Sequence, residues 1–288
     1  MLEYFEMISY SLLGPRSILA MSSQLNSLTE LKLTNLTMDA ISKLPSLTSP
    51  PALEVLSLTD STPTKPDAEL YAIISDVAKW ITSCKALRRL ELRRFLDDAA
   101  LLSEALTDQG PHLTTLSVTG YKMPGSRGFH QALVSQNSLR HLYLHGWGSD
   151  NNDDNNVLVE ALGQLGELRE LQLKDVSDGF SPDHVMTLTP FLPHLEKLWI
   201  SGEYFEDDIW NAFLCLPKLQ SLAINAPSEF TAQGMLDFIA QLGPGNRGLS
   251  LSILYSTTSL AEEAQTVIRD TLKHNLDGSL DYVELQGK

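Results

Sequence analysis

Three ring side chains occupy alternate positions near the middle of the chain, and their types could support chemistry. His141, Tyr143 and His145 are separated by the single leucines Leu142 and Leu144. Imidazoles bind metal ions or transfer protons, and a tyrosine hydroxyl donates or accepts hydrogen bonds. The same residues would form part of a recognition surface if they stood on the exposed face of a strand.

The element that carries His141 and His145 decides whether they can share a metal ion. Residues four apart on a strand are separated by roughly 13 Å, whereas Zn–N bonds are about 2.0 to 2.1 Å long. The alternation of leucines with polar or aromatic residues predicts a strand. We therefore expect no metal at this position, and the other histidines have no cysteine or carboxylate cluster beside them in the sequence.

Other segments that resemble functional motifs are incomplete. The stretch SDNNDDNN, 149–156, lacks the central glycine and closing glutamate of a calcium loop and is predicted to be a solvated loop. GPGNRG, 243–248, lacks the Lys-Ser/Thr of a phosphate loop and is predicted to end a helix in a turn. We expect no catalytic residue and no cofactor.

Paired carboxylates and the two cysteines have structural interpretations. Asp97 with Asp98, and Asp207 with Asp208, each begin a predicted helix, where negative charge favours the helix dipole. Acid–base catalysis by these pairs would need a pocket. Cys84 and Cys215 are both expected to pack in the core as small apolar side chains.

Composition narrows the possible partners. The 288 residues include 21 Lys and Arg against 36 Asp and Glu, a formal net charge of −15. This balance argues against nucleic acid and anionic membranes, which bind through Lys and Arg. No stretch approaches the ~18 apolar residues of a membrane span. With two cysteines and no basic secretory leader, we expect an intracellular protein, cytoplasmic or nuclear.

The elements that position these residues follow from a repeat of the form L-x-x-L-x-L. Eleven such frames, strong or weak, begin at residues 2, 28, 53, 87, 113, 139, 168, 195, 219, 248 and 280. Between frames, segments such as 68–81 and 260–272 carry apolar residues at helical spacing. This pattern is typical of leucine-rich repeats. It predicts an α/β fold, a right-handed leucine-rich-repeat solenoid (horseshoe) with parallel strands on the concave face and helices on the convex face.

The motifs resemble the ribonuclease-inhibitor-like class of leucine-rich repeats, especially those of fungal F-box/LRR proteins. Proline precedes four frames, at Pro51, Pro111, Pro193 and Pro217, and Cys84 precedes another. Three further stretches also resemble segments of this family: LTMDAI, FLDDAALL and the C-terminal GNRGLSLSIL. The resemblance implies a substrate-recognition module related to ubiquitin-ligase subunits.

The sequence departs from that family in two ways. Many repeats of that family have Asn or Cys just after the strand. This chain has bulky and largely apolar residues at that position, so looser turns are expected. The residues are Leu36, Ser61, Phe95, Tyr121, Trp147 and Val176. No F-box is visible, so an adaptor could bind only through an F-box outside this chain. We expect a single domain over 1–288 with about 10–11 repeats and uncapped ends, as in a fragment, a truncated gene model or a paralogue without the docking segment.

Strand alternation predicts a partner-binding patch. The third, fifth and seventh residues of each frame face the concave surface. In the central repeats they gather cationic, imidazole and aromatic side chains: Arg89, Arg93, His141, Tyr143, His145, Lys174, Lys197 and Trp199. Arg, Tyr and Trp are enriched at binding hot spots, although ordinary strand-forming residues on a half-exposed sheet would look similar.

These observations predict a non-catalytic protein–protein recognition scaffold whose concave face binds a protein partner through an acidic segment or acidic surface of that partner. Two alternatives stay open at this point. One is an inhibitor-like regulator of an enzyme, and the other is a purely structural solenoid fragment whose ends stack on further repeats.

Overall fold

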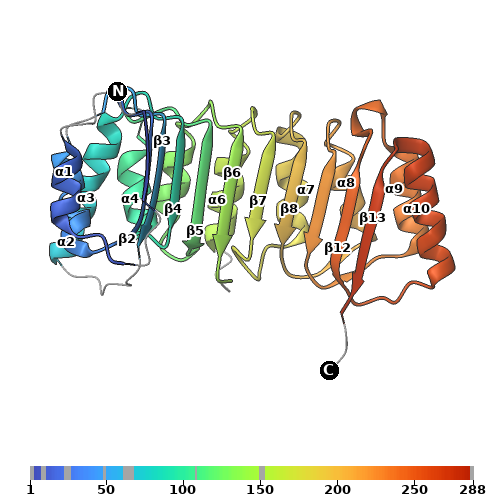
Figure 1. Ribbon diagram of the computed structural model, residues 1–288. Helices are drawn as coiled ribbons and strands as arrows, with labels where there is room; N and C mark the ends of the chain where they lie inside the picture. Colours follow the sequence, from blue (N-terminus) through green and yellow to red (C-terminus); the bar gives the residue numbers. More distant parts are fainter. Residues whose placement is uncertain are drawn as a thin grey trace. The chain divides into compact units, whose positions relative to one another are not determined.

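The computed structural model describes residues 3–7, 11–22, 27–47, 50–60, 68–107, 109–148 and 153–285. Leu2, Ser61 and positions 149–152 of the predicted solvated loop lie outside these residues. The chain divides into two compact units, Met1–Leu139 and Arg140–Lys288, and each is a series of strand–helix repeats (Figure 1).

Among the described residues, the first unit has five parallel strands. They are β1 (Tyr4–Met7), β2 (Glu30–Leu36), β3 (Val55–Asp60), β4 (Arg89–Arg93) and β5 (Thr115–Tyr121). The helices between and after them are α1 (Pro15–Met21), α2 (Met38–Ile41), η2 (Leu44–Ser46), α3 (Ala68–Ser83), α4 (Asp98–Ala105) and α5 (Arg127–Leu133). Consecutive strands pair so that equivalent leucines stand opposite one another, as Leu31, Leu56 and Leu90 do.

The second unit continues the pattern. Its long strands are β6 (His141–Gly146), β7 (Glu170–Lys174), β8 (Lys197–Ser201), β10 (Ser221–Asn225), β12 (Ser250–Ser256) and β13 (Ser279–Glu284). Its helices are α6 (Asp153–Leu162), α7 (Pro182–Leu188), η3 (Thr189–Phe191), η4 (Asp207–Ile209), α8 (Trp210–Phe213), α9 (Ala232–Gln241), η5 (Pro244–Asn246) and α10 (Glu262–Leu276). Two short strands, β9 (Phe205–Glu206) and β11 (Ser228–Glu229), pair with each other, and β11 also pairs with Ser256 at the end of β12.

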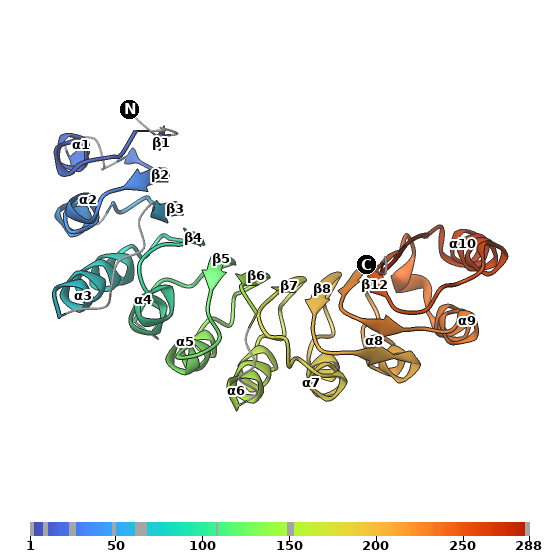
Figure 2. The same cartoon turned by 90° about the horizontal axis from the view of Figure 1, so that it is seen from below.

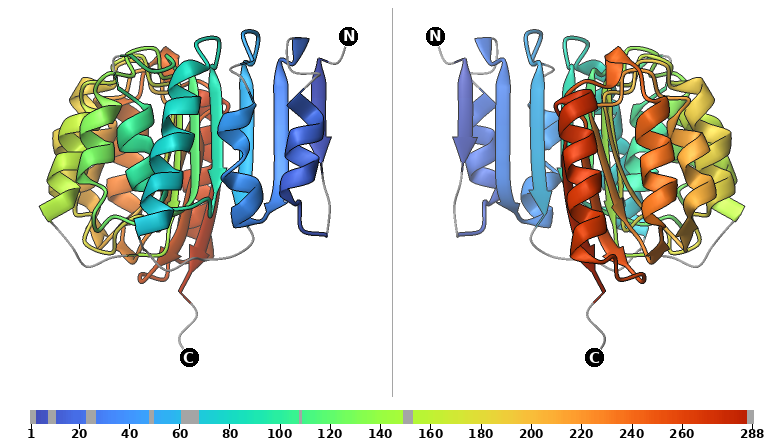
Figure 3. Two further views of the ribbon diagram at one scale, coloured as in Figure 1. Left: turned by 90° about the vertical axis from the view of Figure 1, so that its left-hand side faces the viewer. Right: turned by 90° about the vertical axis from the view of Figure 1, so that its right-hand side faces the viewer.

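Each of the eleven predicted frames forms a strand, which confirms the α/β solenoid. In each unit taken by itself, the helices lie on the outer side of the strands (Figures 2 and 3). The opposite side of each sheet, which carries no helix among the described residues, is called the open face below. The fourth and sixth residues of the frames point toward the helices: Leu222 and Ile224, for example, are 0% exposed. Burial of one such side chain stabilises the fold by about 1.5 to 3 kcal/mol.

The C-terminal ends of the strands are more alike than expected. At four of them a residue with positive φ (Asn35, Arg94, Gly120 or Asp175) precedes the bulky residue singled out in the sequence. That next residue is buried in each case: Leu36, Phe95, Tyr121 and Val176. An apolar side chain therefore closes the core where related repeats use a polar one. Trp147 differs, because its turn has positive φ at Gly148 and the indole is 69% exposed.

The structure agrees with one predicted helix start and with one of the two predicted core cysteines. Asp97 caps α4 by accepting a hydrogen bond from the Ala100 amide at 3.2 Å, as expected. Cys84 is buried, but Cys215 is exposed, so its predicted core position is wrong. The reason is spacing, because Leu216 takes the buried position three residues before its frame. No helix in the described parts is long and apolar enough to span a bilayer.

Candidate functional site

The open face of the second unit brings six of the eight predicted patch residues onto three neighbouring strands. Pairing of β6, β7 and β8 aligns them in rows across the sheet. One row is His141, Glu170 and Lys197, the next is Tyr143, Gln172 and Trp199, and the third begins with His145 and Lys174. The Lys197 side chain is exposed and the others are half-buried. Their orientation away from the core agrees with the strand alternation.

Glu170 organises the centre of this face, although it was not among the predicted patch residues. The Tyr143 hydroxyl donates to Glu170 Oε2 at 2.5 Å, and the Lys197 ammonium group binds Glu170 Oε1. Partial burial alone would raise the pKa of Glu170. Hydrogen bonds from Lys197 and Tyr143, with the charges of Lys197 and His141, outweigh burial and lower it. The ionised carboxylate therefore holds Tyr143 and Lys197 in place.

The other cationic groups of the patch also have neighbours on this face. Lys174 Nζ lies 5.3 Å from the centroid of the Trp199 ring, a cation–π contact that contributes about 0.5 to 1 kcal/mol when exposed. His145 Nε2 lies 3.8 Å from Asp175 Oδ2. The face thus carries aromatic rings and charges of both signs. Because Glu170 and Asp175 lie beside the predicted patch residues, its net positive charge is smaller than those patch residues alone would give.

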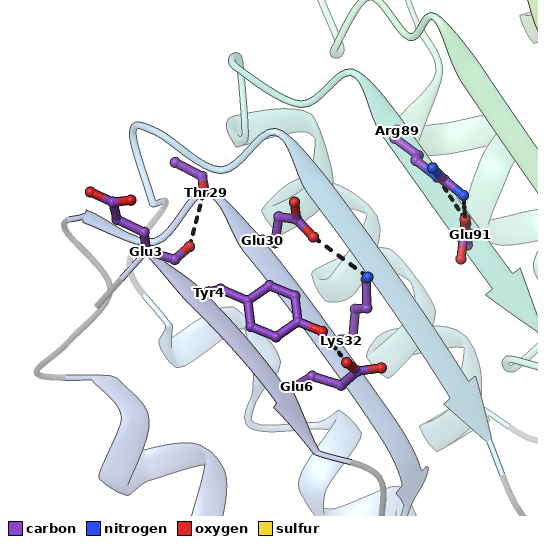
Figure 4. A network of polar contacts seen from close by, with 8 residues as sticks. All are labelled: Glu3, Tyr4, Glu6, Thr29, Glu30, Lys32, Arg89 and Glu91. Atoms are coloured by element: carbon purple, nitrogen blue, oxygen red, sulfur yellow. Dashed lines mark hydrogen bonds and ion pairs between the residues drawn. The ribbon is translucent and has the colours of Figure 1, made fainter. Parts of the chain in front are cut away.

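Arg89 and Arg93, the remaining predicted patch residues, lie on β4 in the first unit. The eight residues therefore fall into two groups, one in each unit. Arg89 Nε donates to Glu91 Oε1 at 2.7 Å, and the guanidinium Nη2 approaches the same oxygen at 2.5 Å (Figure 4). Glu91 is two residues from Arg89 on the same strand. Because side chains two apart lie on the same face of a strand, the sequence alone predicts that these two can pair.

A second network that sequence reasoning missed lies on β1 and β2 (Figure 4). Lys32 Nζ lies 3.5 Å from Glu30 Oε2 and 5.3 Å from the centroid of the Tyr4 ring. The Tyr4 hydroxyl donates to the Glu6 carboxylate, and this hydrogen bond, with smaller contributions from burial and from the charges of Glu6 and Glu30, raises the pKa of Tyr4 to about 12. Both units thus carry a tyrosine bonded to a glutamate beside a lysine.

Within the described ranges, no three or more His, Cys, Asp or Glu residues are grouped so that they could hold a metal ion. His141 and His145 point to the open face from one strand, as expected for the strand interpretation.

One histidine outside the patch is buried in the core of the first unit. His130 on α5 is 0% exposed, and its Nε2 lies 2.5 Å from the Tyr121 hydroxyl. Burial lowers the pKa of His130 to about 4. The imidazole is therefore neutral in the folded chain at neutral pH and serves packing.

This burial predicts an acid-sensitive first unit. The unfolded imidazole, with the ordinary pKa of 6.5, binds more protons than the folded one with a pKa of about 4. The stability contributed by neutral His130 is therefore present above pH 6.5 and is lost as pH falls toward 4, up to about 3 kcal/mol. The free energy of unfolding can be measured in urea between pH 4 and 7 for the wild type and for His130→Phe. It should depend less on pH in the variant. Equal pH dependence would contradict the assigned burial.

In both units the strands are parallel, equivalent leucines of neighbouring strands stand opposite one another, and a helix or turn follows each strand. This is the leucine-rich-repeat fold. One solved structure is similar in fold at a TM-score above 0.5. A chain of the yeast Rad7–Elc1 complex matches with a TM-score of 0.53 and 19% identity, over 94% of this chain and 66% of that one. An internalin from Listeria monocytogenes matches with a TM-score of 0.44 and 15% identity, over 95% and 89% of the two chains.

The likeness to the chain of the Rad7–Elc1 complex shows the fold alone. This chain spans just under two thirds of the matched chain in the Rad7–Elc1 complex. No protein-family model and no curated protein matches the sequence.

Proposed function

We propose that this chain is a non-catalytic recognition scaffold that binds a protein partner on the open face of its second unit. The observation that carries the proposal is the placement of Tyr143 and Trp199, both half-buried, on a sheet face without helix cover. Large rings that are fixed by neighbours and still accessible are typical hot-spot residues. Glu170 fixes Tyr143, and Lys174 lies over Trp199.

The partner would contribute an acidic segment. Lys174 contacts the Trp199 ring, and no carboxylate pairs with it among the described residues, so an incoming carboxylate could bind it directly. Lys197 already pairs with Glu170, so it would add less to the affinity for an acidic partner. The Rad7–Elc1 structure is itself a protein complex, and one chain of it has a fold similar to that of this chain.

A more specific form of the proposal follows from the resemblance in the sequence. The prolines before four frames and Cys84 resemble ribonuclease-inhibitor-like, F-box/LRR proteins of fungal type. The chain would then be an intracellular substrate-recognition module related to ubiquitin-ligase subunits. Binding to a ligase adaptor would require an F-box beyond the residues of this chain.

The test compares proteins captured from cells of the source organism by the wild-type chain and by a Tyr143→Ala/Trp199→Ala variant. Loss of two hot-spot rings is expected to lower recovery of the specific partner at least about tenfold. Tyr71→Ala is the matched control, because Tyr71 lies on α3 and is 54% exposed. Quantitative mass spectrometry gives the recovery, and circular dichroism verifies that all variants fold. If no captured protein depends on the two rings, the proposal is wrong.

A further inference from the structure

A recess in the second unit lies away from the open face, between the turn after α9 and the end of α10. Its volume is about 620 Å³. The turn supplies Pro244 and Arg247, and the end of α10 supplies Lys273, His274, Asn275 and Asp277. The turn is the GPGNRG segment, whose predicted role as a helix stop agrees with the structure, where α9 ends at Gln241 and η5 follows.

The wall that carries Arg247 is held by buried hydrogen bonds. The Asn246 side chain is 2% exposed. Its Nδ2 donates to the carbonyl oxygens of Leu216 and Leu219 at 3.1 and 3.0 Å, and its Oδ1 accepts from the Gly243 amide at 3.2 Å. On the other side of Arg247, the Gly248 amide donates to the Leu276 carbonyl at 2.5 Å, which ties the turn to α10. Both walls are therefore fixed relative to each other.

The recess concentrates positive charge in an acidic protein. Arg247 and Lys273 are cationic, and Asp277 is the acidic residue among the described lining. Lys273 binds the Asp277 carboxylate, and this hydrogen bond, followed by the charges of Lys273 and Arg247, lowers the pKa of Asp277. The dipole of α10 favours Lys273 and His274 in its last turn. That effect does not account for Arg247, which comes from a different segment.

We propose that this recess binds a small molecule that carries a phosphate monoester. Its volume falls within the roughly 300 to 1,000 Å³ of small-ligand sites. The planar fork of Arg247 and the ammonium group of Lys273 suit phosphate oxygens. A phosphate monoester carries about −1.5 to −2 charges at neutral pH, whereas a carboxylate would only replace Asp277 at Lys273. Leu242 and Pro244 offer an apolar surface to the organic part of the ligand.

The test uses phenyl phosphate, benzoate and inorganic phosphate as probes, titrated into the full chain and followed by ³¹P and ¹H NMR. Phenyl phosphate is expected to bind saturably. Benzoate, which has the same ring but a carboxylate, is expected to bind about tenfold more weakly. Inorganic phosphate should also bind more weakly than phenyl phosphate, because it lacks the ring that contacts Pro244.

Three variants locate the binding. Arg247→Gln is expected to weaken phenyl phosphate binding about tenfold or more. Arg269→Gln is the matched control, because Arg269 is on α10 outside the lining and donates to Gln265. Asp277→Asn releases Lys273, and asparagine tolerates the φ of 56° at this position, so binding should tighten severalfold.

Three results would overturn the inference: no saturable binding of phenyl phosphate below about 10 mM, equal binding of phenyl phosphate and benzoate, or unchanged binding in Arg247→Gln. Circular dichroism spectra recorded on the same samples separate loss of binding from loss of fold. The result is independent of Tyr143 and Trp199, so it does not bear on protein recognition by the open face.

Discussion

Replacement of Trp210 by alanine is expected to destabilise the second unit by about 4 kcal/mol. Trp210 is 4% exposed, and its ring centroid lies 4.5 Å from that of Phe230 and 4.9 Å from that of Phe238. Its Nε1 donates to Asp207 Oδ1 at 3.0 Å. The substitution therefore removes a large buried surface, opens a cavity and deletes one hydrogen bond to a carboxylate.

The matched control for this prediction is Trp147→Ala in the same unit. Trp147 is 69% exposed, so its replacement should change the free energy of unfolding by about 0.5 kcal/mol or less. Guanidinium unfolding followed by far-UV circular dichroism measures both variants. Similar losses at the two tryptophans would mean that the burial assigned to Trp210, or the exposure assigned to Trp147, is incorrect.

The second large effect is expected at Asp98, where asparagine should stabilise the first unit at neutral and alkaline pH. Asp98 is 7% exposed at the start of α4. Burial, followed by the negative charge of Asp97, raises the pKa of Asp98 to about 7, although backbone hydrogen bonds and the charge of Lys122 act in the opposite direction. At pH 8 the wild type must therefore keep a buried carboxylate ionised.

The sign of the pH dependence follows from proton uptake. Between pH 3.8, the ordinary pKa, and about 7, folded Asp98 binds more protons than the unfolded residue. Its contribution to stability is therefore present below pH 3.8 and is lost as pH rises through 7, by about 4 kcal/mol at most. Asp98→Asn should gain about 2 to 4 kcal/mol over the wild type at pH 8 and little at pH 4.

Urea unfolding at pH 4, 6 and 8 measures this effect, and Asp76→Asn is the control. Asp76 lies on the exposed side of α3, where its Oδ1 is 3.5 Å from Lys79 Nζ, so its replacement should change the free energy of unfolding only slightly. A gain for Asp98→Asn that is equal at pH 4 and pH 8 would contradict the raised pKa.

The repeat was predictable because its signal is local and redundant. Parallel pairing requires each strand to place the same two positions against the helices, so a leucine frame predicts both the strand and its register. Even the weak frame that begins at Gly248 forms β12, in register with β10 through Leu222 and Leu251. The open-face position of Tyr143 follows from the same alternation.

The contacts on the open face of the second unit were less predictable, because they join residues 25 or more positions apart. Glu170 meets Tyr143 and Lys197 across neighbouring strands, and each contact spans 27 positions. A polar residue at an open-face position carries no signal of which neighbour it binds. Trp147 is exposed where the equivalent residues at four other strand ends are buried, and the positive φ there lies at Gly148, after the tryptophan and not before it.

The separation of buried and open-face positions within each strand has an evolutionary consequence. In β7, Leu171 and Leu173 are completely buried, whereas Glu170, Gln172 and Lys174 are not. Mutations at the latter three positions alter the presented surface while the aliphatic columns that define the architecture stay intact. Substitutions can therefore accumulate on the open face of one strand at a time while the buried side chains that hold the fold stay unchanged.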